Sequence, residues 1–228
     1  MKIAILIQAR SESTRLPGKI FLEINGKTIL QRVLNACNEA AKTIKSVENH
    51  DVLVAVIGPY NDSVLRDYCT KHEVPFFGGQ EEDVLSRYME ASGHYNADLI
   101  VRITADCVMM PADIISQCVS QALQTKADYI SNTIIRTFVE GWDVQIVTKH
   151  ALRWFDCEQK HKREHPFVEF DENAKMRDKF VTSGYSIQHF LNAANPALIK
   201  TSIDTKEDYE RLKEYICKQE QENAPTSG

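Results

Sequence analysis

Residues 2–37, KIAILIQARSESTRLPGKIFLEINGKTILQRVLNAC, contain the pattern that decides the fold. A short apolar run from Lys2 to Ile7 predicts a strand that is covered on both faces. From Ile29 onward, apolar side chains recur at helical spacing, and Thr28 stands where an N-cap is expected. A strand, a polar loop and a helix therefore form the first unit of the chain.

The same order repeats through the first half of the sequence. Residues 52–57 (VLVAVI) predict a second strand, and Asn61 or Asp62 is placed to cap the next helix. Further strands are expected at 74–77 and 98–104, with helices at 81–92 and 111–122. This alternation predicts a single α/β domain with a doubly wound, mostly parallel sheet.

Several polar residues follow the predicted strands. They are Gln8, Arg10, the pair Gly78–Gly79, and Asp106. In doubly wound sheets, ligands bind at the carboxyl ends of the strands. We therefore expect these residues to share one rim of the sheet.

The pattern becomes weaker after Asp128. Residues 128–132 (DYISN), 143–148 (DVQIVT) and 198–204 (LIKTSID) predict strands, and 205–216 predict a closing helix. Residues 156–185 are charged and poorly periodic, so we expect an excursion from the domain after about residue 155. The domain is expected to span 1–217, and the polar residues 218–228 to form a disordered tail.

Composition narrows the possible classes of protein. The chain has 228 residues and a net charge of -5, whereas general nucleic-acid binders need a basic face. The opening apolar run is too short for a signal peptide or a membrane span. The six cysteines are scattered without a C-x-x-C pair and are expected to be reduced. We expect a cytoplasmic protein that binds neither nucleic acid nor membranes.

The loop from Ala9 to Lys19 is unusually cationic for an acidic chain. It carries Arg10, Arg15 and Lys19, together with hydroxyl side chains and the turn-forming pair Pro17–Gly18. Such groups suit a polyphosphate, although composition alone is equally compatible with a solvated charged loop. Neither the P-loop nor the dinucleotide-binding glycine pattern is present.

Two acids emerge from distant parts of the chain at predicted strand ends. Asp106 follows LIVRITA, and Asp204 follows LIKTSI. Together they could bind Mg²⁺, which prefers one or two carboxylates with substrate phosphates and water. Either acid alone is also compatible with an ordinary helix cap or turn.

An ordered set of motifs runs through most of the chain, from residue 3 to about 212. The motifs are QARSESTRLPGKIFLEINGKTIL, GGQEEDVLSRY, VRITADC, SNTIIRTFVEGWDVQIV, REH and SIDTKEDY. In these motifs the chain resembles the cytidylyltransferases, which include the CMP-KDO and CMP-acylneuraminate synthetases. It is most similar to their SpsF branch of spore-coat polysaccharide biosynthesis.

The resemblance implies a GT-A-like, Rossmann-like nucleotidyltransferase that requires Mg²⁺. It would transfer CMP from CTP to a sugar acid or related small acceptor, release pyrophosphate, serve surface-polysaccharide synthesis and form a homodimer. Arg10, Lys19 and Asp106 would be catalytic.

The resemblance also implies binding roles for particular residues. Arg10, Arg15 and Lys19 would bind the triphosphate, and Asp106 and Asp204 the metal. The base or ribose would lie near Ala9, Gln80, Asp83 and Arg102. The acceptor would meet Asn132, Arg136, Asp143, Glu164 and His165, although ordinary loop and edge-strand roles are equally compatible with the first three. Trp142 belongs to the same acceptor-side stretch.

A zinc site is a rival interpretation of the excursion. Cys157, His161 and His165 are spaced four apart and would form one stripe on a helix. The fourth ligand is missing, and three basic residues surround the stripe. The resemblance instead implies that the excursion borders the active site or a dimer contact.

Two other functions are alternatives. One is a glycosyltransferase that uses a nucleotide sugar on the same kind of sheet, but the expected D-x-D metal motif is absent from the sequence. The other is a non-catalytic nucleotide-binding protein, which the cations and acids named above make unattractive.

Overall fold

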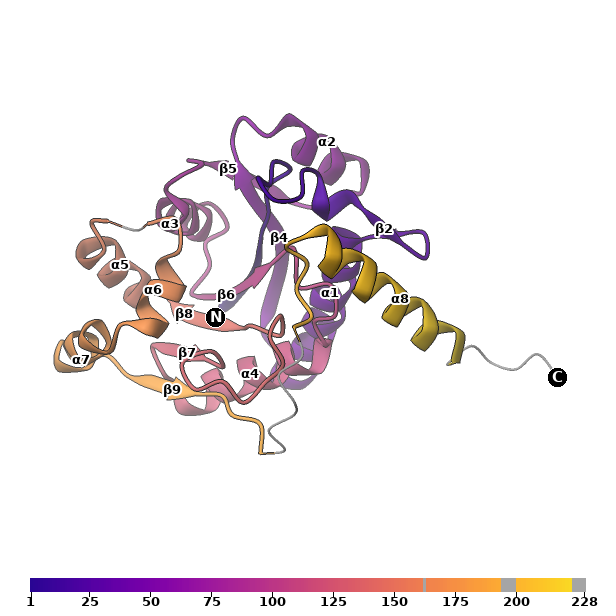
Figure 1. Ribbon diagram of the computed structural model, residues 1–228. Coiled ribbons are helices and arrows are strands. Elements are labelled where there is room, and N and C mark those ends of the chain that lie inside the picture. The colour runs from indigo at the N-terminus through magenta and orange to yellow at the C-terminus, as the bar shows by residue number, and fades with distance from the viewer. Residues whose placement is uncertain (162, 194–199, 223–228) are drawn as a thin grey trace.

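The computed structural model describes residues 1–161, 163–193 and 200–222, and Figure 1 traces the whole chain. The strands are β1 (Lys2–Gln8), β2 (Glu23–Ile24), β3 (Lys27–Thr28), β4 (Asp51–Pro59), β5 (Phe76–Gly79), β6 (Leu99–Thr104), β7 (Tyr129–Ser131), β8 (Gln145–Thr148) and β9 (Ile187–His189). The helices are the 3-10 helix η1 (Lys19–Phe21), α1 (Ile29–Glu48), α2 (Ser63–Lys71), α3 (Val84–His94), α4 (Ala112–Thr125), α5 (Lys149–Glu158), α6 (Pro166–Glu172), α7 (Ala174–Thr182) and α8 (Lys206–Glu222).

One large sheet forms the centre of the molecule. Its strand order is β5-β4-β1-β6-β8-β7-β9, and β2 and β3 form a separate hairpin. Strands β5, β4, β1 and β6 pair in parallel, whereas β8 runs antiparallel to both of its neighbours. The expected α/β fold with a mostly parallel sheet is confirmed.

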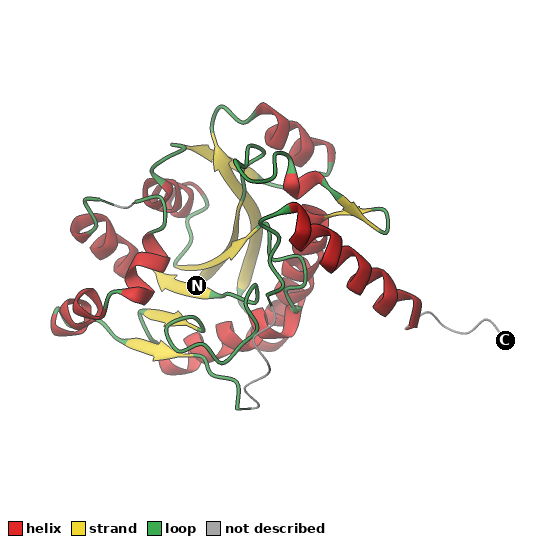
Figure 2. Ribbon diagram, in the orientation of Figure 1, coloured by secondary structure: helices red, strands yellow, loops and turns green. Residues whose placement is uncertain are grey.

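Alternation along the strands assigns side chains to the two faces of the sheet. Ile3, Ile5 and Ile7 of β1 face a core that α1, α2 and α4 cover. Ala4 and Leu6 face a second core formed with α3, α5, α6 and α7. Figure 2 shows this arrangement of helices on both sides of the sheet. A strand buried on both faces explains the continuous apolar run at the start of the chain.

Side-chain caps begin two helices, α1 and α2, where the sequence predicted them. Thr28 accepts a hydrogen bond from the N–H of Gln31 at 3.0 Å, and Asp62 accepts one from Leu65 at 3.0 Å. Asp83 caps α3 in the same way, at 2.8 Å from the N–H of Ser86. Such bonds satisfy N–H groups that have no partner within the helix.

The excursion expected at 156–185 is part of the core. Helices α5, α6 and α7 bury a group of aromatic side chains against the second face of the sheet. The sequence pattern failed here because α6 and α7 are short: two aromatic residues bury α6 and one buries α7, without a long apolar period. The buried aromatic residues are Trp154, Phe155, Phe167, Phe170 and Phe180.

Two expectations for the C-terminal part were wrong within the described residues. Residues 200–204 contain no strand, and the expected strand's residues 198–199 lie outside the described residues. The closing helix continues through 218–222, which were expected to be disordered. Glu220 explains this extension, because its carboxylate pairs with Arg32 at 2.8 Å and accepts from Asn25 at 2.6 Å. Residues 223–228 of the expected tail lie outside the described residues.

The zinc stripe is not formed. Helix α5 ends at Glu158, so Cys157 is helical and His161 is not, and the spacing of four no longer aligns the three side chains. Within the described residues, no group of three or more His, Cys, Asp or Glu side chains could hold a metal ion. All six cysteines are free thiols, as expected. None of the helices in the described ranges is both long and apolar enough to cross a membrane.

Candidate active site

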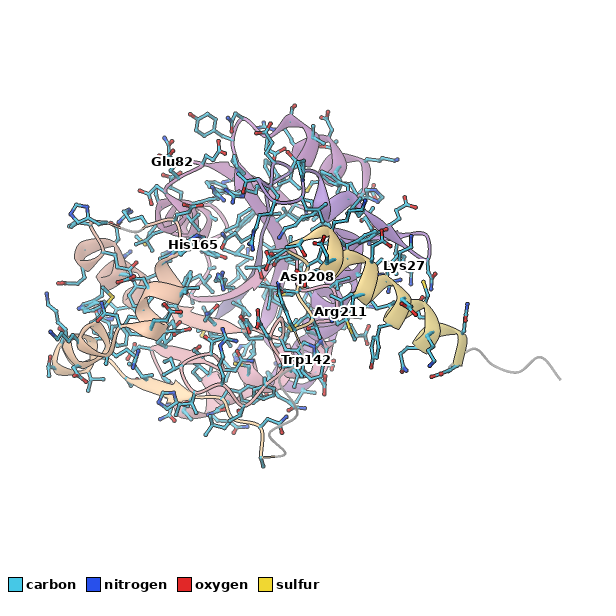
Figure 3. All side chains as sticks on the ribbon, in the orientation of Figure 1. Lys27, Glu82, Trp142, His165, Asp208 and Arg211 are labelled. Atoms are coloured by element: carbon cyan, nitrogen blue, oxygen red, sulfur yellow. The ribbon has the colours of Figure 1, made fainter. Side chains whose placement is uncertain are left out.

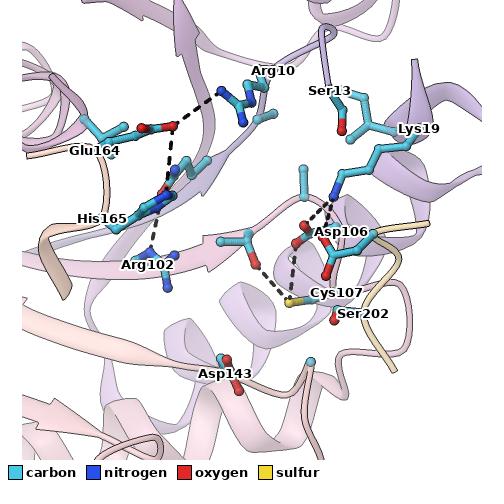
Figure 4. A pocket seen from close by; sticks show the side chains of 18 of the residues that line it. Arg10, Ser13, Lys19, Arg102, Asp106, Cys107, Asp143, Glu164, His165 and Ser202 are labelled. Atoms are coloured by element: carbon cyan, nitrogen blue, oxygen red, sulfur yellow. Dashed lines mark hydrogen bonds and ion pairs between the residues drawn. The ribbon is translucent and has the colours of Figure 1, made fainter. Parts of the chain in front are cut away.

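A pocket of about 340 Å³ opens at the carboxyl ends of β1 and β6 (Figure 4). Its walls come from the loop after β1, the start of α3, the turn after β6, the loop before β8 and the segment before α8. The sequence-predicted residues that line it are Ala9, Arg10, Arg15, Lys19, Arg102, Asp106, Arg136, Asp143, Glu164, His165 and Asp204.

The loop after β1 is held in shape by a few specific bonds. Gly18 has φ 68° and ψ 12°, a left-handed conformation that favours glycine, and its N–H donates to the carbonyl of Ser11 at 3.0 Å. The N–H and hydroxyl of Ser11 both donate to the carboxylate of Asp62 at 2.7 Å. Asp62 therefore caps α2 and fixes the loop, and Lys19 follows at the first position of η1.

Lys19 joins the two acids that the sequence singled out. Its Nζ atom lies 2.7 Å from Asp106 Oδ2 and 3.3 Å from Asp204 Oδ1, and it also donates to the carbonyl of Ile203 at 2.7 Å. Arg15 reaches Asp204 Oδ1 at 2.9 Å. Two carboxylates from distant parts of the chain thus converge on a single cation.

The backbone also positions Asp204. The N–H of Ile203 donates to the carbonyl of Asp106 at 3.1 Å, and the N–H of Asp204 donates to Asp208 Oδ2 at 3.2 Å. Burial alone would raise the pKa of the Asp204 carboxyl, but the ammonium groups of Lys19 and Lys200 outweigh it and lower that pKa below its usual value. Asp204 is therefore a carboxylate at neutral pH.

A second charged group occupies the other end of the pocket. Arg10 Nη1 lies 3.5 Å from Glu164 Oε1, and His165 Nε2 lies 3.9 Å from the same oxygen. Figure 4 shows Arg102 near this group and away from Lys19 and Asp106. The pocket therefore has a carboxylate-rich end and an end with two guanidinium groups.

Some predicted site residues have other roles. Asp83 caps α3 and pairs with Arg163 at 2.8 Å, and neither Asp83 nor Gln80 lines the pocket. Asn132 is buried and its amide bridges the backbone of Trp142 and Val144, so it holds two loop segments together.

Arg136 and Asp143 do reach the pocket, as a mutual ion pair at 3.2 Å. Trp142, from the same stretch, does not line the pocket and packs partly buried against the core.

The model of the cytidylyltransferase family matches residues 4–228. The chain belongs to the cytidylyltransferase family. The spore coat polysaccharide biosynthesis protein SpsF of Bacillus subtilis is 26% identical to this cytidylyltransferase over 214 residues, which cover 92% of this chain and 85% of SpsF. The expected family and its SpsF branch are thereby confirmed, and the protein is a nucleotidyltransferase.

Two solved structures support the same fold. A cytidylyltransferase from Leptospira borgpetersenii serovar Hardjo-bovis is 34% identical with a TM-score of 0.78, and the match covers 96% of this chain and 87% of that one. A CMP:2-keto-3-deoxy-manno-octonic acid synthetase complexed with CTP has a TM-score of 0.69 at 16% identity, covering 96% and 100% of the two chains. The second likeness shows the shared fold alone.

Sequence reasoning missed one buried cation of this cytidylyltransferase. Arg87 is 2% exposed, lines the pocket, and donates to the carbonyls of Gln80 and Glu81 at 2.5 and 2.9 Å. Burial lowers the pKa of Arg87. The available signal was its position on α3, because it falls on the same helical face as Val84 and Ala91, where an arginine is unusual.

Other lining residues also went unpredicted. They carry hydroxyls, carboxylates and a thiol, but few of them stand out by type in the sequence. Cys107 is buried beside Asp106. Burial is the larger cause and the charge of Asp106 the smaller cause of a raised pKa of the Cys107 thiol, so the thiol stays protonated. The missed residues include Thr104, Cys107, Glu140, Gly141 and Ser202.

The acids of the cytidylyltransferase fit a magnesium ion. Mg²⁺ is commonly bound by one or two carboxylates, with the remaining ligands supplied by substrate phosphates and water. Asp106 Oδ2 and Asp204 Oδ1 already converge on one positive centre, the Lys19 ammonium, inside an open pocket. Asp106 and Asp204 are therefore the residues that would hold the ion.

Proposed function

We propose that the protein transfers CMP from CTP to a sugar acid or related small acceptor, with release of pyrophosphate and with Mg²⁺ as cofactor. One observation carries the proposal: Lys19, Asp106 and Asp204 converge within a pocket that Arg10 and Arg15 also line. Family membership supports the choice of a cytidine nucleotide. Similarity to SpsF supports a role in the synthesis of a surface polysaccharide.

The cations of the loop after β1 would bind the triphosphate. Arg10 and Arg15 each offer a planar fork of N–H donors that matches phosphate oxygens, and Lys19 offers a compact point charge. Arg10 and Lys19 start from pairs with Glu164 and with the two acids. The incoming phosphates would therefore replace carboxylates as partners of these cations.

The chemical step needs positioning and charge stabilisation. An oxygen of the acceptor attacks the α-phosphorus, the bond from that phosphorus to the bridging oxygen breaks, and pyrophosphate leaves with the electron pair. The proton of an attacking hydroxyl goes to solvent. Mg²⁺, when bound, would neutralise charge on the phosphates. Lys19 and Arg10 stabilise the negative charge that grows on the leaving pyrophosphate.

A pyrophosphate-release screen tests the proposal. Four nucleoside triphosphates are crossed with sugar acids, sugar phosphates and phosphonates, with and without Mg²⁺. We expect release with CTP, only in the presence of Mg²⁺ and of one acceptor class. Calorimetry measures CTP binding separately.

Two results would contradict the proposal. One is the absence of calorimetric binding of CTP in the presence of Mg²⁺. The other is preferential use of a different nucleotide. The expected homodimer is a separate prediction, and light scattering of the purified protein tests it.

A further inference from the structure

Arg102 is a buried cation that faces the pocket. It comes from β6 on the face that also carries Ile100, and it is 9% exposed. Its guanidinium carbon lies 5.8 Å from the centre of the Phe167 ring. Arg102 lines the pocket, so a bound molecule can reach it.

The partners of Arg102 are neutral groups. Nη1 donates to Gln145 Oε1 at 2.5 Å, and Nε donates to Gln8 Oε1 at 3.4 Å. Within the described ranges, no carboxylate lies at ion-pairing distance from Arg102, and the Tyr88 hydroxyl, another neutral group, also interacts with its guanidinium. A desolvated charge without an ionic partner is costly in a folded protein. An anion in the pocket would remove this cost.

The Gln145 side chain links Arg102 to the acid Asp171. Gln145 Nε2 donates to Asp171 Oδ2 at 2.9 Å, while Gln145 Oε1 accepts from Arg102. Asp171 is buried and also accepts from Tyr129 at 2.8 Å and Ser131 at 2.9 Å. Gln145 is thus locked in one orientation by two neighbours, and it fixes the guanidinium without neutralising it.

The position of Arg102 indicates which molecule supplies the anion. Lys19, Asp106 and Asp204, which would meet the metal and the leaving phosphates, lie at the opposite end of the pocket (Figure 4), whereas Arg10, the other triphosphate ligand, pairs with Glu164 at this end. The cytosine base and the ribose carry no charge and do not require a buried guanidinium. Arg102 lies away from the metal and the leaving phosphates, which favours the acceptor as the source of its anion.

We propose that Arg102 binds the acidic group of the acceptor, a carboxylate or a phosphate, and that Gln145 and Asp171 are positioning residues for its guanidinium. This inference rests on the proposed function and adds the acceptor's charge and its contact. It replaces the base or ribose contact that the resemblance implied for Arg102. Acceptors without an acidic group would be rejected, because they leave the buried charge unpaired.

Nuclear magnetic resonance of the arginine Nε–H groups tests the contact directly. The Arg102 signal is assigned by its loss in Arg102→Lys, and the exposed Arg153 provides the matched control through Arg153→Lys. The wild-type protein is first saturated with α,β-methylene CTP and Mg²⁺. Acetate and methylphosphonate are then titrated separately, which distinguishes a carboxylate from a phosphate-like group. We expect a saturable shift of the Arg102 signal with one of them and none for Arg153.

Two results would overturn the inference. The first is a shift of the Arg102 signal upon addition of the nucleotide alone, with no further shift from either anion. The second is an Arg102 signal that does not shift with the nucleotide, with acetate or with methylphosphonate. Calorimetry of the same nucleotide keeps the tests distinct: absent binding overturns the proposed function, whereas binding without an anion response at Arg102 overturns only this inference.

Variants of Gln145 test the positioning role. Gln145→Glu places a carboxylate against Arg102, so anion binding should be lost; because it also replaces the amide that donates to Asp171, circular dichroism and nucleotide calorimetry first establish that the variant is folded. Gln145→Leu removes the bridge, and it should weaken anion binding without changing nucleotide affinity. Normal anion binding in Gln145→Glu would overturn the assignment. In steady-state assays with the acceptor found in the screen, Arg102→Gln should raise the KM for the acceptor roughly 30-fold or more, with the KM for CTP within about twofold.

Discussion

Lys19 donates a hydrogen bond from Nζ to Asp106 Oδ2 at 2.7 Å, although Lys19 begins η1 and Asp106 lies in the turn after β6. Lys19→Met should reduce CTP-dependent pyrophosphate release by about 10²- to 10³-fold, because one stabilising cation is lost. It should also lower the free energy of unfolding by about 1–3 kcal/mol, since Asp106 loses its cationic partner. Initial rates and urea denaturation measure these two effects.

The control for this variant is Lys42→Met. Lys42 forms an exposed pair with Glu39 at 3.4 Å, which should contribute less than about 1 kcal/mol. Equal losses of stability in the two variants would contradict the structural importance of the Lys19 contacts.

Asp106→Asn should abolish the activation of the reaction by Mg²⁺ while the protein stays folded. An amide oxygen is a weaker magnesium ligand than a carboxylate, and the substitution keeps the shape of the side chain. Titration of MgCl₂ in the pyrophosphate assay measures the activation, and the melting temperature measures folding. Asp178→Asn, at an exposed position on α7, should behave as wild type. A normal magnesium response in Asp106→Asn would rule out Asp106 as a ligand.

The lowered pKa of the Asp208 carboxyl makes the stability of the protein depend on pH. Burial alone would raise its pKa, but Lys200 and the N–H groups of Asp204 and Thr205 outweigh it and lower the pKa to about 2. The unfolded value is about 3.9, so the carboxylate stabilises the folded state above that pH. The contribution is lost as the pH falls from about 4 to about 2.

Asp208→Asn should therefore be less stable than wild type at pH 7 by about 1–2 kcal/mol. The difference should shrink below about pH 4 and vanish near the folded pKa. Urea denaturation of both proteins at several pH values measures it. Figure 3 shows Asp208 and Arg211 at the end of α8 nearest the sheet, and their contact at 3.4 Å is a smaller part of this network. A difference that is independent of pH would contradict the ionic origin.

Gly141 should be intolerant of a side chain for two reasons. Its φ is 97°, and a Cβ would meet the backbone nitrogen of Ser202 at 2.6 Å and Thr201 Oγ1 at 2.7 Å. Gly184 has a similar φ of 91° but nothing within 4 Å of such a Cβ. Gly184→Ala should therefore lose about 1–2 kcal/mol of stability from backbone strain alone.

Gly141→Ala should lose more stability than Gly184→Ala, and it should also lose activity. Ser202 and Asp204 line the pocket, and the clash would displace the segment to which they belong. Thermal melting and pyrophosphate release measure the two losses. Equal melting temperatures for the two variants would show that the close approach at Gly141 has no energetic consequence.

Phe170→Ala should destabilise the protein by about 3–5 kcal/mol, because it removes a fully buried ring from the aromatic group of α5, α6 and α7. Val168→Ala, on the exposed side of the same helix, should lose less than about 1 kcal/mol. Urea denaturation of both variants makes the comparison. A minor loss for Phe170→Ala would restore the view of this region as an excursion from the core.

The first half of the fold was predictable from local signals. Strand β1 is a continuous apolar run, and Thr28 and Asp62 cap helices whose apolar positions repeat with a clear period. The region after Asp128 was harder because its strands are short. Strand β9 spans Ile187–His189 and pairs with β7, which is far away in the sequence, so no local sequence pattern predicts β9.

The site was predictable where charge stood out against its surroundings. Arg10, Lys19 and Asp106 follow buried strands, and the sheet brings such positions to one rim. Asp83 was misplaced because capping and ligand binding use the same residue type, and only the structure shows its bond to Ser86. The amide bridge of Asn132 depends on tertiary contacts with Trp142 and Val144, and no local sequence pattern predicts these contacts.

Helix α8 begins two residues after Asp204, yet few of its side chains are buried. Leu212 and Ile216 pack against the small group that contains Ile24, and the remaining attachments are mostly polar. Segments with so little buried apolar surface can detach locally while the rest of the molecule stays folded. Catalysis would then fail at a lower urea concentration than the sheet does. Enzymatic activity is therefore a more sensitive reporter of helix detachment than any spectroscopic signal from the core.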